Sequence, residues 1–539
     1  MKIELPPIPP EERTPLVESL LAIIYHLQDR VQQLEGTVQQ LRDEIAVLKG
    51  QKPRPPIAPS RLESPAPQPR PEGSQRPGSA KRPKKAQLVI TEVIRLPVVD
   101  APAGSVSKGY EEYVVQELAI QAKATRYLRE RVRTPDGRSV LAALPQDVVS
   151  GSHFGPQLIT YILQQYHHNH VTQPLLLEDL EERGIDISAG QLSRILVEGK
   201  ESFHQEKAEL LPAGLAVSSY VGVDDTGARH AGRNGFCTVI SNAWFASFES
   251  TDSKSRLNFL QVLQGAVRSY VINAATWAYW GRQELSAEWA EKLSCGPREF
   301  ADDASWQARL AELGMTGERP VRTATEGALV GGLVARGVSA DLVTLSDGAQ
   351  QFFVFAHAAC WVHAERPLLR LVPYNDEHRA VIAKVRDQIW ELYKDLKAYG
   401  QHPDASQKPL LEARFDALCD QRAGYANIQG VLRDLREHKA YLLRILERPE
   451  VPLHNNGTES DIRDYVKKRK ISGSTRSHDG RRCRDTFASL KKTCRKLGVR
   501  FCNYLLDRIR GRDAIPRLAD LIRQRAAEHQ RASVEAAPG

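Results

Sequence analysis

This chain of 539 residues contains only seven cysteines, and no two of them form a CxxC pair. Because they are scattered and odd in number, they indicate neither a zinc ribbon nor a disulfide framework. No apolar run approaches the roughly 18 residues that a membrane helix needs. The first 15 residues are rich in proline and acid, unlike a signal peptide. We therefore expect a reduced, soluble, cytoplasmic protein.

Positive charge is concentrated in two places along the chain. The net charge is +8, yet residues 51–86 hold nine Lys and Arg against two Glu. Residues 462–500 hold fourteen Lys and Arg against three Asp, so the remainder of the chain is acidic. Either patch alone could be a solvated surface. Two such patches favour a polyanionic partner.

The N-terminal segment predicts self-association. Residues 17–48 carry apolar side chains in a heptad pattern, with β-branched residues at a and Leu at d from Leu20 onward. This choice favours a parallel two-stranded coiled coil over a helix packed on its own domain. Residues 51–86 contain ten prolines and almost no large apolar side chains, which is typical of a disordered basic linker.

The next region is predicted to be mostly helical. Residues 87–97 alternate like a short strand, and 110–130 have a helical pattern. A helix over 175–183, a turn over 184–188 and a helix over 189–198 capped by Ser188 give a helix-turn-helix outline. Such an outline suits either DNA reading or an ordinary helical domain. The histidines of 166–170 lie on a helical pattern, as a surface or packing feature.

The pattern changes to strands from about residue 217. Apolar segments at 218–226, 235–244, 245–249 and 340–346 predict strands, and 358–363 follows. Helices are predicted over 254–268, within 283–335 and over 378–448. We expect an α+β multidomain protein. Its segments are a coiled-coil helix (1–50), a basic linker (51–86), a helical DNA-binding region (87–212), a mixed-sheet core (213–375), a helical insertion (376–450) and a closing helix with a basic C-terminal region (451–539).

Three carboxylates stand where metal-dependent phosphodiester chemistry would need them. Asp224 and Asp347 end two predicted strands, and Glu459 begins a helix capped by Asn455 or Asn456. Carboxylates from separate elements can converge to hold two cations. Each acid also has an ordinary reading, as a turn residue, a helix cap or a partner of the helix dipole. Asp225 competes with Asp224, but successive strand residues point to opposite faces.

These residues resemble transposases of the insertion sequence 66 type. Residues 223–226 resemble that family's first-aspartate motif, and Asp347-Gly348 with 360–366 its second-aspartate and Cys-Trp-x-His motifs. Residues 455–459, followed by Arg463 and Arg469-Lys470, resemble its Asn-Asn-x-x-Glu helix. The resemblance spans roughly 120–510.

The resemblance implies a ribonuclease-H-like core with Asp224, Asp347 and Glu459 as catalytic metal ligands. It implies two Mg²⁺ ions, for which Mn²⁺ can substitute. Water would be the nucleophile that nicks the element ends, and the freed 3′-hydroxyls would be the nucleophiles that join them to target DNA. Cys360 and His363 would shape the pocket. Implied partners are the DNA, a second copy of the chain through the coiled coil, and accessory proteins of the same element. The chain would associate with the nucleoid when bound to DNA.

Two departures from the family stand out. The family has a cysteine-rich segment before its helical region, but residues 87–150 contain no cysteine, so we expect no zinc there. The stretch between Asp224 and Asp347 is long and carries an extra helical insertion at 277–294.

His357-x-x-Cys360-x-x-His363 could be a metal half-site, but no second pair follows it.

Basic side chains after Glu459 are candidates for holding the DNA backbone. On one helix they cover several faces, so not all can meet one duplex. The candidates are Arg463, Lys467, Lys468, Arg469, Lys470, Arg476, Arg481 and Arg482. Two readings compete with transposition: a catalytically silent DNA-binding descendant, and a ribonuclease-H-like nuclease that only hydrolyses.

Overall fold

The computed structural model describes residues 90–97, 109–145, 148, 152–422 and 425–535, and eight single positions between 14 and 30. The chain divides into a unit of residues 1–116 and a unit of residues 117–539. The described positions from 17 to 30 are helical, and Leu20, Ile24 and Leu27 are exposed there. The rest of the predicted coiled coil and the whole predicted linker lie outside the described residues, so both stay predictions.

The segment before residue 145 differs from the sequence prediction. Residues 90–97 form no strand, and 109–130 form no helix. The apolar side chains Tyr113, Leu118 and Leu128 are more than four-fifths exposed. An amphipathic helix is stabilised chiefly by packing its apolar face, and that packing is missing here. The regular structure is a short antiparallel hairpin of β1 (Arg131–Arg133) and β2 (Ser139–Leu141).

The helical region begins at residue 156, where proline starts the first helix. The elements are α2 (Pro156–Leu163), a π-helical turn (Gln164–His168), α3 (Gln173–Glu182), α4 (Ala189–Val197) and α5 (Glu201–Ala216). Ser188 accepts a hydrogen bond from the backbone N–H of Gln191, whose side chain accepts from the Ser188 N–H. This capping box confirms the predicted helix–turn–helix outline. Its role in reading DNA stays a prediction.

A five-stranded mixed sheet forms the centre of the unit of residues 117–539. Its strands are β3 (Tyr220–Gly227), β4 (Phe236–Ser241), β5 (Ala246–Thr251), β8 (Val343–Ser346) and β9 (Ala356–Ala359). The order is β5-β4-β3-β8-β9: β3, β4 and β5 are antiparallel neighbours, and β8 and β9 run parallel to β3. The strands predicted over 218–226, 235–244, 245–249 and 340–346 are therefore present as β3, β4, β5 and β8. Residues 358–363 leave the sheet at Ala359 and turn into a helix.

Helices from distant parts of the chain cover the two sheet faces. On one face Val239 and Phe248 pack with Ile462 of α16 (Asn456–Ser472), and α17 (His478–Lys496) lies along β5. On the other face Val223 and Ile240 belong to a core shared with α5, α6 (Arg256–Gln264) and α10 (Glu318–Ala335). Alternation along each strand sends neighbouring residues to opposite faces. The chain closes with α18 (Phe501–Arg510) and α19 (Leu518–Glu535).

Two insertions interrupt the sheet. The first contains α6 (Arg256–Gln264), β6 (Tyr270–Val271), α7 (Ala274–Arg282), α8 (Ala287–Ser294), β7 (Glu299–Phe300), α9 (Asp303–Glu312) and α10 (Glu318–Ala335). The predicted insertion at 277–294 corresponds to part of α7 and to α8. The first insertion packs around buried aromatic rings such as Trp280 and Trp306.

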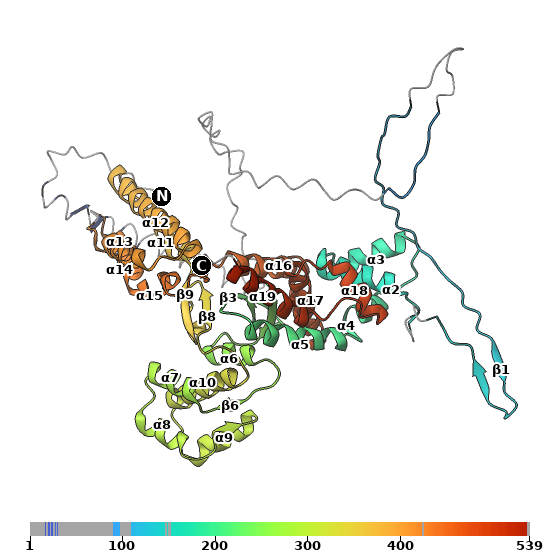
Figure 1. Ribbon diagram of the computed structural model, residues 1–539, viewed down its shortest axis with the longest axis horizontal. Helices are drawn as coiled ribbons and strands as arrows, with labels where there is room; N and C mark the ends of the chain where they lie inside the picture. Colours follow the sequence, from blue (N-terminus) through green and yellow to red (C-terminus); the bar gives the residue numbers. More distant parts are fainter. Residues whose placement is uncertain are drawn as a thin grey trace, which may run out of the picture. The chain divides into compact units, whose positions relative to one another are not determined.

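The second insertion separates β9 from α16. It contains α11 (Trp361–Arg370), α12 (Asp376–Gln401), α13 (Lys408–Asp420), α14 (Ala426–Glu437) and α15 (Lys439–Leu442). Figure 1 shows these helices together in yellow and orange. They bury their own apolar core around Val385 and Phe415. Helices α12 to α15 lie within the predicted insertion of 376–450, whereas α11 lies before its predicted start. Among the described helices, none has an apolar stretch long enough to cross a bilayer.

Candidate active site

Asp224 and Asp347 lie beside each other at one edge of the sheet. Gly222 of β3 pairs with Leu345 of β8 in parallel register, and each aspartate stands two residues further along its strand direction. Two residues along a strand return to the same face. Asp224 therefore shares the face of Gly222, which α16 covers, while Asp347 is exposed directly after the end of β8 at Ser346. Asp224 lies inside β3 rather than at its end, since the strand continues to Gly227.

Asp225 belongs to the opposite face. Its Oδ2 accepts a hydrogen bond of 2.8 Å from Nε2 of Gln351, in the turn after β8. Its backbone N–H donates to Oδ1 of Asp224 at 2.8 Å. The strand alternation thus separates the two carboxylates as the sequence pattern predicts.

Glu459 reaches the same edge because the first turn of α16 lies against β3. Nδ2 of Asn455 donates to the carbonyl oxygen of Val223 at 2.9 Å, and its backbone N–H meets Sγ of Cys360 at 3.3 Å. A Cβ added to Gly222 would lie 2.1 Å from Oγ1 of Thr458 and 2.5 Å from Oδ1 of Asn455. The absence of a side chain at residue 222 therefore lets the helix approach the strand.

The charges of the neighbouring acids act on Asp224. The pKa of Asp224 is raised to about 7, first by burial and then by the negative charges of Asp347, Asp225 and Glu459. Like charges at close range disfavour ionisation of all the groups at once. A site that holds three such acids at neutral pH is suited to a cation.

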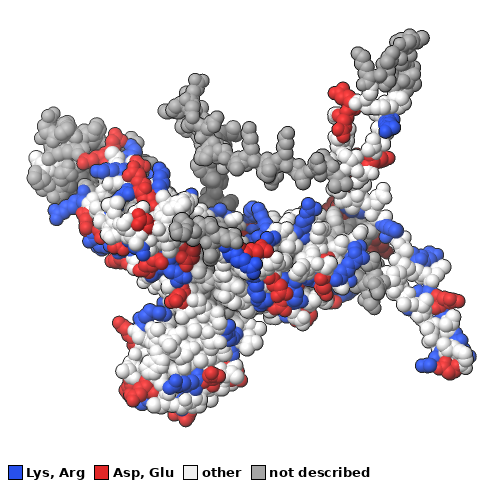
Figure 2. All heavy atoms as spheres, in the orientation of Figure 1, with Lys and Arg blue, Asp and Glu red and all other residues white. Residues whose placement is uncertain are grey.

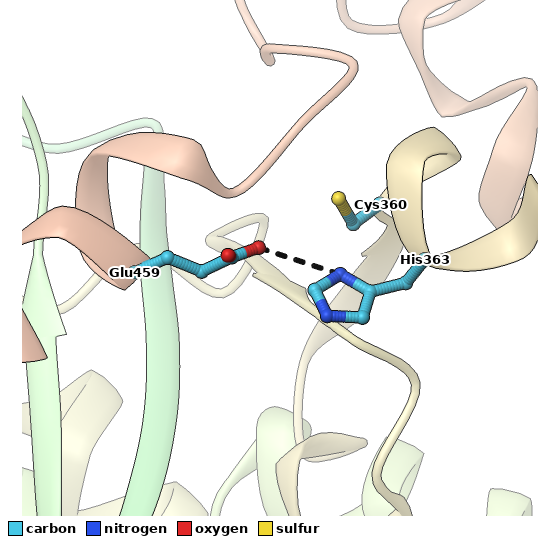
Figure 3. A group of neighbouring side chains, drawn as sticks. All are labelled: Cys360, His363 and Glu459. Carbon is cyan, nitrogen blue, oxygen red and sulfur yellow. Dashed lines mark ion pairs between the residues drawn. The ribbon is translucent and has the colours of Figure 1, made fainter. Parts of the chain in front are cut away.

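Donor groups surround the carboxylate of Glu459. Its Oε2 lies 2.9 Å from a guanidinium nitrogen of Arg463 and 3.6 Å from one of Arg366. Its Oε1 is buried without a hydrogen-bond partner among the described residues and lies 3.5 Å from Nδ1 of His363. Figure 3 shows the imidazole from α11 pointing at this carboxylate from α16. Arg366 also contacts Nε2 of His363.

Cys360 and His363 join Glu459, but His357 does not. One ligand atom from each of Cys360, His363 and Glu459 lies within 4.8 Å of the others. Burial raises the pKa of the Cys360 thiol and, with Arg366, lowers that of His363. His357 stacks on Phe353 with ring centroids 3.8 Å apart, and burial lowers its pKa to about 3. The sequence pattern His357-x-x-Cys360-x-x-His363 suggests that His357 joins Cys360 and His363. In the structure the third member of that group is Glu459, which the pattern does not reveal.

Comparisons with known proteins give the family of this chain. The model of the Transposase IS66 family matches residues 348–482. An uncharacterized protein of Sinorhizobium fredii, y4jO, is 42% identical over 322 residues, covering 59% of this chain and all of that protein. The chain belongs to the IS66 transposase family. The family match begins directly after Asp347 and includes Glu459 and the basic residues that follow it.

In this IS66 family member, the predicted DNA-binding cations fall into separate groups. Lys467, Lys470 and Arg476 are exposed, and Figure 2 shows basic side chains gathered over α16 on the visible face. Arg463 is exposed but pairs with Glu459. These four remain candidates for phosphate contacts.

The other candidates have partners within the fold. Arg469 donates to Oγ1 of Thr226 at 3.1 Å and ties α16 to β3. Arg481 pairs with Asp252 at 2.9 Å, and Arg482 with Glu201 at 3.0 Å. Each would have to leave its present partner to bind a phosphate.

Lys468 differs from the other predicted DNA-binding cations because it is buried, and its contact with DNA stays a prediction. Its side chain is buried, and Nζ donates to the carbonyl oxygen of Tyr166 at 2.7 Å while lying 3.4 Å from the centre of that ring. Lys468 faces the helical region because a run of four cations winds around α16. Only the tertiary structure distinguishes it from Lys467 and Lys470.

Sequence reasoning also missed residues that position the acids. Asn455 was expected only as a helix cap, and Gly222 and Gln351 carried no signal by themselves. The Asn455–Cys360 contact joins two motifs that are 95 residues apart. The order of the motifs along the chain could indicate that they meet, but not through which atoms.

Proposed function

We propose that this chain is a DNA transposase with a ribonuclease-H-like core that cleaves element ends and joins their 3′-hydroxyls to target DNA. The strand order β5-β4-β3-β8-β9, with three parallel strands and an antiparallel pair beyond them, supports such a core. The observation that carries the proposal is that Asp347 and Glu459 lie near enough to Asp224 for their charges to raise its pKa, in a chain of this family.

The donor set fits hard divalent cations. Asp224, Asp347 and Glu459 offer carboxylate oxygens, which Mg²⁺ and Mn²⁺ prefer. Oε1 of Glu459 is buried without a hydrogen-bond partner among the described residues, and such an atom is costly unless a ligand satisfies it. Two bound Mg²⁺ ions would activate the attacking oxygen and stabilise the leaving one.

The surrounding residues hold Glu459 in place for this role. Asn455 and Thr458 fix the start of α16 on β3. Because Arg366 contacts Nε2 of His363 and the lowered pKa of His363 favours neutral imidazole, the ring proton is assigned to Nδ1. That nitrogen lies 3.5 Å from Oε1 of Glu459 but forms no hydrogen bond with it. His363 would orient the carboxylate, which gives a physical meaning to the predicted pocket-shaping role.

The DNA would follow the exposed cations near the site. Lys467, Lys470 and Arg476 can contact phosphates without breaking an ion pair among the described residues. Contacts of this kind give affinity that falls with salt and carry no sequence information. A dimer or larger assembly formed through residues 17–48 would bring two element ends together, with accessory proteins of the element as further partners.

Strand joining tests the proposal. Labelled duplexes that carry the sequences flanking the gene are incubated with Mg²⁺ and a target plasmid, using the wild-type chain and Glu459→Gln. The proposal predicts nicked and joined products only with the wild-type chain. Nicking without joining would favour a nuclease. DNA binding with no product from either protein would favour a catalytically silent descendant.

A further inference from the structure

A basic cavity lies on the opposite side of α16 from Glu459. It has a volume of about 670 Å³ and is bounded by α16, the loop 473–477, the start of α17 and the helical region. Lys468 follows Glu459 by nine residues, or two and a half helical turns, which places the two side chains about 180° apart around α16. Substitutions in the cavity therefore leave the three carboxylates untouched.

Positive charge in the cavity wall exceeds negative charge. Among the lining residues, five are basic and one is acidic. The basic ones are Lys468, Arg476, Arg484, Lys491 and Lys492, and the acid is Asp464. We call these residues the basic cavity.

Three of these cations are buried, and one has no carboxylate partner. Lys491 pairs with Asp464, and Lys492 lies 3.7 Å from Asp461. Within the described part of the chain, no carboxylate lies within ion-pair distance of Lys468. A buried cation without an anion is destabilising. Consistent with this, burial and the neighbouring Arg484 and Lys491 lower the pKa of Lys468 to about 7.

Two uncharged polar groups in the cavity wall also have unsatisfied hydrogen-bonding capacity among the described residues. Nε2 of His167 and Oγ of Ser472 are buried without hydrogen-bond partners among the described residues. His167 is more than nine-tenths buried and stacks on Phe487 at 4.1 Å, so its orientation is fixed. Buried polar atoms are rarely left unsatisfied. These two atoms therefore point independently to a missing ligand.

The start of α17 adds a further preference for an anion. Ser477 caps this 19-residue helix and lines the cavity together with Gly480. A helix N-terminus carries partial positive charge and exposed N–H groups, which suit phosphate oxygens. Thr475 and Ser474 supply further hydroxyl groups in the wall.

We propose that the basic cavity binds a phosphate group of a DNA strand, as either a terminal 5′-phosphate or an internal phosphodiester. A phosphate supplies the negative charge that Lys468 lacks and acceptor oxygens for Lys, Arg and hydroxyl donors. This inference rests on the proposed function only in taking DNA as the source of the phosphate. It makes the cavity a second anchoring point, separate from the catalytic carboxylates.

Binding experiments on the full chain in EDTA test this site without catalysis. The variants are Lys468→Met and Arg476→Ala, with Lys397→Met, an exposed lysine of α12, as the control for charge removal. Fluorescence anisotropy measures the affinity for a 20-base-pair duplex across a salt series. We expect an affinity loss of about tenfold in the first two variants, with a salt slope shallower by about 0.9 per lost phosphate contact. The control should match the wild-type chain.

Three further arms identify the ligand. Tighter wild-type binding to a 5′-phosphorylated duplex than to a 5′-hydroxyl duplex identifies a terminal phosphate, and equal binding an internal one. Inorganic phosphate should raise the melting temperature of the wild-type chain and not that of Lys468→Met.

The proposal is overturned if both cavity variants bind DNA like the control, even where inorganic phosphate still binds. Since Arg476 lies in an exposed loop, its variant remains informative if Lys468→Met misfolds. Glu459→Gln should bind DNA normally, so a failure of catalysis is distinguishable from a failure of this site.

Discussion

Nδ2 of Asn455 donates to the carbonyl oxygen of Val223 at 2.9 Å, and this bond joins the start of α16 to the strand that carries Asp224. Val223 directly precedes Asp224, and Asn455 lies four residues before Glu459. One hydrogen bond therefore fixes the distance between the first and third acids. The Asn-Asn-x-x-Glu motif contributes a positioning contact as well as a carboxylate.

Replacing Asn455 should weaken both stability and activity. Asn455→Ala leaves the Val223 carbonyl without this donor in a buried place, which should lower the free energy of unfolding by about 1–3 kcal/mol. Urea unfolding measures the change. The neighbouring Asn456 is exposed, so Asn456→Ala should unfold like the wild-type chain. Equal losses in the two variants would contradict the positioning role.

A methyl group at residue 222 should displace α16. In Gly222→Ala the new Cβ would clash with Thr458 at 2.1 Å and with Asn455, so the helix must move away from β3. We expect cleavage to fall by a factor of at least about 100, because catalysis depends on ångström-scale placement. Gly227→Ala is the control, since its Cβ would make an ordinary contact of 3.5 Å with Arg469. Wild-type cleavage rates in Gly222→Ala would refute the close approach.

Asp224 should destabilise the metal-free fold at high pH. Its pKa is about 7 in the folded chain against an ordinary value of 3.8. Above pH 7 the folded chain bears the full cost of the buried charge. As the pH falls from 7 towards 4, the folded chain takes up the proton before the unfolded chain does, and the cost shrinks. Asp224→Asn in EDTA should therefore raise the urea midpoint more at pH 8 than at pH 4.5. A pH-independent difference would show that the carboxyl titrates normally.

Arg463 should compete with metal ions for Glu459. Its guanidinium lies 2.9 Å from Oε2, so a cation must displace it or share the oxygen. Arg463→Ala should bind Mn²⁺ more tightly in the absence of DNA, as measured by isothermal titration. Lys467→Ala removes an exposed charge from the same helix and should change Mn²⁺ affinity less. A weaker affinity in Arg463→Ala would mean that the arginine supports the metal site.

The sequence predicts the strands and helices of the core well. It predicts less well which residues outside the strands are buried. Strand alternation correctly separates Asp224 from Asp225, and the Ser188 cap predicts the start of α4. The helix predicted over 110–130 is wrong because periodicity describes a possible apolar face, not the surface needed to cover it. The burial of Lys468 is not readable from the cation run either, because its partner Tyr166 lies 302 residues away.

The candidate site is also only partly readable from sequence. The positions of the acids after and within apolar strands indicate a common edge of the sheet. Their mutual distances depend on Gly222 and Asn455, which act through tertiary contacts. The grouping of Cys360 and His363 with Glu459 likewise requires the second insertion to return the chain to β3.

Single-turnover cleavage by three separate variants tests the central claim most directly. Asp224→Asn, Asp347→Asn and Glu459→Gln are compared with the wild-type chain on labelled duplexes of the gene's flanking sequences, in Mg²⁺. If the three carboxylates form one metal-dependent site, each variant should lose at least about a thousandfold in rate while binding the same DNA with unchanged affinity. Cleavage at the wild-type rate by any one of the three folded variants would contradict the account.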